Sequence, residues 1–139
     1  MKFCLIFLLL FSFAGCGGEQ PKPEAAIPAD ADLRVDMMIQ GSGKDRTVEF
    51  TFFYTHSVPP GDKSAPTVDV IAVDEARVND TPMTASSNAV GRTVYTAEES
   101  ALKLENTISA KVNGRQYEGK VRALTTLPNR SATAVLSPK

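Results

Sequence analysis

The strongest constraint on the fold is the pair Asn113 and Gly114, which lies between two stretches of alternating apolar and polar side chains. Asn-Gly favours a type I′ turn, because both central positions of that turn need a positive φ. The turn pairs Val112 with Arg115, Ala110 with Tyr117 and Ile108 with Gly119. One face of the hairpin then carries the apolar side chains of Ile108, Ala110, Val112, Tyr117, Val121 and Ala123. Turn chemistry and periodicity agree, so the sequence predicts a half-buried hairpin over residues 108–123.

A second hairpin is predicted over residues 33–54. Apolar side chains recur there at every second position, in two rows: Leu33, Val35, Met37 and Ile39, then Val48, Phe50, Phe52 and Tyr54. This period is that of strands buried on one face. Residues 41–45 have turn chemistry. Phe53 is the one bulky apolar residue on the polar row, and we expect it to cover a sheet edge or to contact a partner.

Shorter strands are predicted in the rest of the chain. Residues 67–73 are apolar on both faces, which is typical of a central strand. The pair Asn79-Asp80 tolerates positive φ and fits a two-residue turn, after which Pro82 limits the returning strand to a sheet edge. Residues 92–97 and 133–136 have the pattern of short strands.

These elements predict an all-β domain over residues 32–139, an antiparallel β-sandwich of immunoglobulin-like type with about seven strands. A small β-barrel is the alternative. The chain has no Trp, and Asn106 stands near the place of the corner tyrosine of immunoglobulin domains. Residues 98–104 suffice for only about two helical turns, so we expect a short crossover helix or an irregular loop.

The first residues have the three parts of a secretory signal. Lys2 is basic, residues 3–13 form an apolar run of eleven residues, and small residues follow. A transmembrane helix needs about 20 apolar residues. Gly15, Gly17 and Gly18 would also end a buried helix at once. We therefore expect residues 1–15 to be removed as a signal peptide.

The end of this segment, Phe13, Ala14, Gly15 and Cys16, resembles the lipobox of bacterial lipoproteins, in which Leu is usual where Phe13 stands. The resemblance implies that Cys16 is diacylated, becomes the first residue and is acylated again at its amino group, with palmitate-type chains. Several chains hold a protein firmly, because about 0.8 kcal/mol accrues per buried CH₂. Gly17 stands where an aspartate would indicate retention in the inner membrane, so the resemblance favours the outer membrane.

Residues 16–31 are expected to form the lipidated N-terminus and a flexible tether. Their three prolines favour extended backbone, which at about 3.1 Å per residue spans on the order of 40 Å. Loss of residues 1–15 removes Lys2 and no acid, which leaves 14 basic against 16 acidic residues and a formal charge of −2. This small imbalance gives no electrostatic reason to expect a nucleic-acid partner. Cys4 is lost and Cys16 is blocked by lipid, so no disulfide is expected.

No catalytic or cofactor site is predicted. His56 is the only histidine, and its neighbour Ser57 would point to the opposite face of a strand, so a polar residue at a strand end is expected rather than a nucleophile and its base. Residues 41–44, Gly-Ser-Gly-Lys, lack the spacing of a phosphate-binding loop. Two acidic groups were weighed as calcium ligands and lack EF-hand spacing: Asp30, Asp32 and Asp36, and Asp74 with Glu75. No metal site and no small-molecule substrate are therefore predicted.

The sequence favours a non-catalytic binding or structural module that is held at the bacterial cell envelope by Cys16. Its means of recognition would be the loops at residues 58–66 and 86–91, or an open sheet edge. The alternatives are an accessory subunit of an envelope or secretion assembly, with an envelope protein as partner, and a hydrolase with an unrecognised site.

The anchor can be tested directly. We expect Cys16→Ser to abolish labelling by radioactive fatty acid and to release the chain from the membrane fraction, because the acyl chains are attached through Cys16. Labelling and cell fractionation of the wild type and the variant would measure this. A variant that is still lipidated would contradict the assignment.

Overall fold

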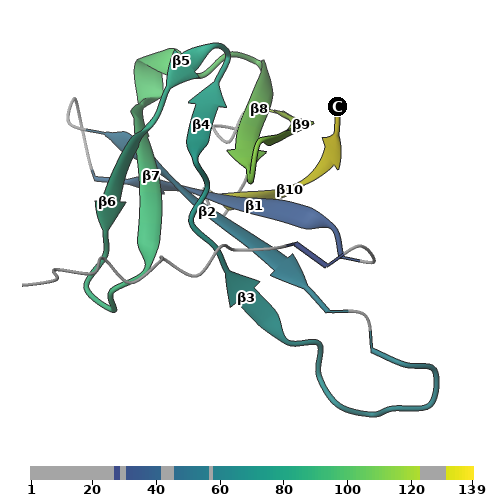
Figure 1. Cartoon of the computed structure of the whole chain (residues 1–139). Helices are drawn as coiled ribbons and strands as arrows, with labels where there is room; N and C mark the ends of the chain where they lie inside the picture. Colours follow the sequence, from purple (N-terminus) through teal and green to yellow (C-terminus); the bar gives the residue numbers. More distant parts are fainter. Residues whose placement is uncertain (1–26, 29–30, 42–45, 57, 123–130) are drawn as a thin grey trace, which may run out of the picture.

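A computed structural model of the chain describes residues 27–28, 31–41, 46–56, 58–122 and 131–139. These residues form ten β-strands and one turn of 3₁₀ helix (Figure 1). The strands are β1 (Leu33–Gln40), β2 (Thr47–Thr55), β3 (Val68–Val70), β4 (Glu75–Val78), β5 (Thr81–Pro82), β6 (Thr84–Ser87), β7 (Thr93–Glu98), β8 (Glu105–Val112), β9 (Arg115–Arg122) and β10 (Ser131–Pro138), with the 3₁₀ turn η1 at Glu99–Ala101. The predicted all-β, antiparallel fold is confirmed.

The strands form a nearly closed, barrel-like sheet in the order β5-β4-β8-β9-β10-β1-β2-β7-β6, with β3 added to β2. Strand β10 joins two layers, because it pairs with β1 through residues 131–136 and with β9 through Ser137 and Pro138. On the opposite side β5 pairs with β4 and β6 pairs with β7, and only Met83 separates β5 from β6. The sheet thus combines features of the predicted sandwich and of the alternative barrel. It has ten strands where about seven were expected, and of the three short strands β3, β5 and β6, only β6 lies where no strand was predicted.

The β8–β9 hairpin has the predicted register, and the predicted pairing of the two strands within residues 33–54 is confirmed. Strand β8 pairs with β9 across Asn113 and Gly114, which have φ values of 50° and 77°. Strand β1 pairs with β2, and the predicted apolar rows face the interior. The side chains that these strands and β10 contribute to the hydrophobic core are Leu33, Val35, Met37, Ile39, Val48, Phe50, Phe52, Ile108, Ala110, Val112, Tyr117, Ala134 and Leu136. Ala123 lies outside the described residues.

The prediction of a central strand over residues 67–73 is wrong. Only β3 is a strand there; it lies at the edge of the sheet, and Val68 is 55% exposed. After β3 the chain leaves β2 and crosses to β4 in the other layer. Ile71 and Val73 are buried because they lie in this crossing, which explains why the sequence is apolar at successive positions.

The hydroxyl group of Tyr95 binds the main chain of this crossing at Val73. The main-chain N–H of Val73 donates to the Tyr95 hydroxyl at 2.7 Å, and that hydroxyl donates to the Val73 carbonyl at 2.8 Å. The Tyr95 ring contacts Phe52 edge-on, with centroids 5.2 Å apart. On either side, the N–H of Ile71 donates to β2 and the N–H of Asp74 donates to β8. The crossing is thus bonded to both layers.

A second buried polar contact supports the Asn79-Asp80 turn, whose φ values of 49° and 69° confirm the predicted geometry. The amide of Asn79 donates to Asn106 Oδ1 at 2.7 Å and to the Ala101 carbonyl at 2.9 Å. Asn106, which is 1% exposed, also bonds to both main-chain groups of Lys103. These bonds join the turn to η1 and to the start of β8. Residues 98–104 accordingly form the end of β7, one 3₁₀ turn and an irregular segment, within the predicted alternatives.

One contact near the predicted boundary between tether and domain is not revealed by the sequence pattern. Ile27, inside the predicted tether, packs against the core. Beyond it, the described domain begins with β1. Packing therefore involves at least one residue before position 32.

We expect Tyr95→Phe to lower the free energy of unfolding by about 1–3 kcal/mol, because two buried main-chain groups of Val73 lose their partner. Tyr54→Phe is the matched control: its ring is only partly buried, and a change within about 0.5 kcal/mol is expected. Urea unfolding would measure both. Equal effects would contradict the role of the Tyr95 hydroxyl.

The same group predicts a pH dependence. Burial raises the pKa of Tyr95 above its ordinary value of 10.0. The folded protein therefore holds the proton more tightly than the unfolded chain, and stability should fall as the pH rises above about 10. In Tyr95→Phe this part of the decline should be absent, which thermal unfolding at a series of alkaline pH values would detect.

Candidate functional site

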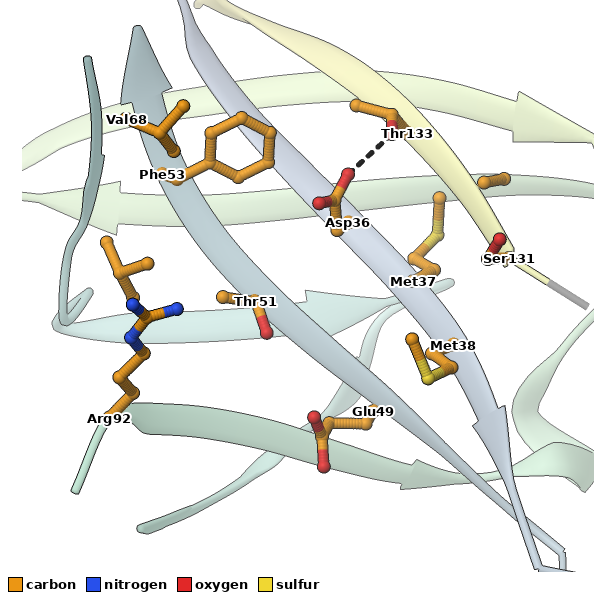
Figure 2. Close-up of a pocket in the computed structure, with 12 residues that line it drawn as sticks. Asp36, Met37, Met38, Glu49, Thr51, Phe53, Val68, Arg92, Ser131 and Thr133 are labelled. Atoms are coloured by element: carbon orange, nitrogen blue, oxygen red, sulfur yellow. Dashed lines mark hydrogen bonds between the residues drawn. The ribbon is translucent and has the colours of Figure 1, made fainter. Parts of the chain in front are cut away.

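A hollow of about 530 Å³ lies on the outer face of the layer that contains β1, β2, β3 and β10 (Figure 2). This is the face on which the sequence pattern places polar side chains. We call it the outer-face hollow; Asp36, Thr51, Phe53, Val68, Arg92 and Thr133 are among its lining residues. We take it as the candidate binding site because apolar, acidic and basic side chains all line it.

The register of the sheet brings the lining residues together. Asp36 pairs with Thr51 on β2 and with Thr133 on β10, so the three lie in one row across the sheet. Thr133 Oγ1 donates a hydrogen bond to Asp36 Oδ1, drawn as the dashed line in Figure 2. Two positions after Asp36 on β1, and therefore on the same face, Met38 pairs with Glu49 of β2. Residues from distant parts of the sequence therefore share one surface.

Phe53 forms the apolar wall of the outer-face hollow. It is 8% exposed and pairs with Val70 of β3, and Val68 lines the same wall. Figure 2 shows the ring of Phe53 beside Val68. Phe53 is paired on both sides, with Arg34 of β1 and with Val70 of the edge strand β3, and its covering of a sheet edge stays a prediction. Its contact with a partner stays a prediction.

The charges of the outer-face hollow come from three side chains. Asp36 and Glu49 are acidic, and Arg92 enters from the start of β7. In Figure 2, Arg92 and Met38 lie on opposite sides of Thr51. Among the described residues, no carboxylate forms an ion pair with Arg92. Although the hollow carries two acidic side chains and one basic one, Arg92 has no ion-pair partner in the described part of the chain, and it can bind the carboxylate of a ligand that also has an apolar group.

His56 follows β2, as the sequence suggests, and it has a partner that the sequence does not reveal. Its Nε2 lies 2.8 Å from Asp69 Oδ2, and both side chains are about half exposed. The Tyr54 ring meets the His56 ring edge-on at 5.1 Å. The pair ties the end of β2 to β3. Ser57, the neighbouring hydroxyl, lies outside the described residues.

Two of the acidic residues that could serve as calcium ligands have other partners. Asp36 bonds to Thr133, and Glu75 forms an ion pair with Lys111 at 3.8 Å. In the part of the chain that the structure describes, no three His, Cys, Asp or Glu side chains come together as a metal site. Asp30 lies outside the described residues, as do residues 42–45.

The two predicted recognition loops differ from each other. Residues 58–66 form an exposed loop without strands that extends beyond β2 and β3 (Figure 1). Within it, the N–H of Ser64 donates to Asp62 Oδ1 at 2.9 Å, and this bond lowers the pKa of Asp62. The prediction of a loop over 86–91 is wrong for Ser86 and Ser87, which belong to β6 and pair with β7. The actual turn begins at Asn88, whose side chain accepts main-chain bonds from Val90 and Arg92.

A comparison of two neighbouring residues tests the placement of the outer-face hollow. Phe52 is fully buried in the core, whereas Phe53 faces outward. We expect Phe52→Ala to lower the free energy of unfolding by about 3–5 kcal/mol. Phe53→Ala should cost only about 1–2 kcal/mol, because water can fill the space that it leaves. Urea unfolding of both variants measures the difference, and a larger loss for Phe53→Ala would contradict the assigned faces.

Cys16 and the rest of the lipobox-like motif lie outside the described residues, so lipidation stays a prediction. Among the residues that are described, no helix has the length and apolar character needed to span a membrane. Comparisons with protein-family models, with curated proteins and with solved structures found no match.

Proposed function

We propose that this chain is a bacterial lipoprotein whose β-domain is a non-catalytic binding module, held at the outer membrane by acylated Cys16. The observation that carries the proposal is the lipobox-like motif at residues 13–16, followed by a proline-containing segment and then an all-β domain. Acyl chains at Cys16 would provide the anchor, and residues 16–31 the distance from the lipid.

The outer-face hollow supports a binding role for the domain. It combines the apolar wall at Phe53 with Arg92, which forms no ion pair with any described residue. Protein-binding surfaces commonly combine a buried aromatic group with an arginine. A protein partner in the envelope is therefore proposed.

A second candidate function is that of an accessory subunit in an envelope or secretion assembly. The extension of the 58–66 loop beyond the barrel favours it, because a projecting loop can reach into a neighbouring subunit (Figure 1). In this role the partner would be integral to the membrane.

Photo-crosslinking in cells would test the binding role. A photoreactive residue at Thr51, in the outer-face hollow, should crosslink to one discrete envelope protein. The same residue at Gln116, exposed on β9 in the other layer, is the control and should not. Recovery of an integral membrane protein would favour the accessory-subunit role.

The same crosslinking experiment is repeated in a chain that carries Cys16→Ser. The Thr51 crosslink should be lost there, because the domain leaves the membrane. Equal crosslinking from Thr51 and Gln116, or none from either position, would contradict a binding role for this face.

A further inference from the structure

The outer edge of β3 presents free main-chain groups. The N–H of His56 donates to the Thr67 carbonyl at 3.1 Å, and the N–H of Ile71 donates to the Phe52 carbonyl at 2.9 Å. In an antiparallel ladder, the residues that bond to the neighbouring strand alternate with residues whose N–H and C=O point away. Thr67, Asp69 and Ile71 thus bond to β2. Val68 and Val70 therefore direct their N–H and C=O groups away from it.

These groups are available to another strand. Within the described residues, no hydrogen bond reaches the main-chain N–H or C=O of Val68 or Val70 from the side away from β2. Val68 is 55% exposed, and Val70 is partly exposed. A sheet edge with unpaired main-chain groups and β-branched side chains is a template for the addition of a strand.

The surroundings of this edge specify the chemistry of the added strand. Val68 and Val70 line the outer-face hollow, and so does Arg92. A strand that pairs with Val68 and Val70 would carry alternate side chains on this same face. Apolar side chains would extend the surface formed by Phe53 and the two valines, and a carboxylate would neutralise Arg92.

A second copy of this chain is a poor occupant. A two-fold axis at Asp69 would place Asp69 directly opposite its own copy, and like charges in that position destabilise a pair. An axis at Val68 would pair Val70 with Pro66, which has no N–H to donate. An axis at Val70 would pair Val68 of one copy with Ala72 of the other. Ala72 is not available for this pairing, because it lies in the crossing between the layers after β3 has ended.

We propose that β3 binds an extended peptide segment of a partner protein by strand addition, and that this segment has alternating apolar side chains and a carboxylate that pairs with Arg92. The inference deepens the binding role proposed above, and it rests on that role for the existence of a partner. The main chain of the segment supplies affinity, and Arg92 with the valine side chains supplies selectivity.

A displayed library of random short peptides, selected on the purified full chain in detergent, would test this. We expect enrichment of peptides with alternating apolar residues and at least one acidic residue. In hydrogen exchange measured by NMR, the amides of Val68 and Val70 should exchange about tenfold more slowly when an enriched peptide is added. The amide of Asp69, which already bonds to β2, should change little.

Three variants make the test specific. Val68→Pro removes an outward N–H, and proline is tolerated at such a position of an edge strand, so the domain should fold while binding weakens about tenfold or more. Val68→Thr keeps the N–H and should bind as the wild type does. Arg92→Glu, a change at an exposed side chain, should replace the preference for acidic peptides by one for basic peptides.

The outcomes separate this inference from the proposed function. The inference is overturned if no peptide is enriched, if a folded Val68→Pro variant binds the enriched peptides as well as the wild type, or if Arg92→Glu leaves their charge preference unchanged. If the crosslink from Thr51 to an envelope protein persists in Val68→Pro, the module binds its partner without strand addition, and only the inference fails. Peptide binding without any crosslink in cells would instead count against the envelope role alone.

Discussion

The bond between the Tyr95 hydroxyl and the main chain of Val73 is the contact on which the arrangement of the two layers depends. A chain that crosses a protein interior brings N–H and C=O groups with it, and each group left without a partner costs about 1–3 kcal/mol. One hydroxyl satisfies both groups of Val73, since it accepts from one and donates to the other. The crossing can therefore be short and buried. As a result β3 stays at the edge of one layer while β4, only a few residues later, belongs to the other.

The sheet limits its free edges at two places where the chain passes from one layer to the other. Strand β10 changes partner from β1 to β9 near its end, where Gly119 lets it approach, because a Cβ atom at Gly119 would overlap the Val135 carbonyl oxygen. On the other side, β5 and β6 make the same kind of change around Met83. Strand β3 takes part in neither closure. Like the end strands β5 and β6, it therefore pairs on one side only, in a sheet whose other strands each pair on both sides.

Local patterns in the sequence predicted the local parts of this structure. The register of the β8–β9 hairpin follows from Asn113 and Gly114, and the inward rows of β1 and β2 follow from period-two alternation. The candidate site was only partly predictable. Phe53 stands out because it breaks the polar row, but nothing in the sequence places Arg92 in the same hollow as Val68, since that depends on the order of the strands. The same holds for His56 with Asp69 and for Asn79 with Asn106, whose pairing needs the completed sheet. The sequence predicts a central strand where the chain in fact crosses between the layers after β3. Residues buried in a crossing and residues buried in a sheet are both apolar at successive positions, so the sequence does not distinguish them.

The pairing of β1 with β10 has a consequence for how the domain forms. Asp36 and Thr133 are bonded neighbours although 97 residues separate them in the sequence. Closing so long a loop is slow, because the chain loses conformational entropy before the contact contributes any stabilising free energy. Strand β1 can pair early with β2, yet its other edge stays open until residues 131–136 are present. The barrel therefore cannot be completed progressively from its first strand, and a chain that emerges from a ribosome or a membrane pore remains unclosed until β10 is available.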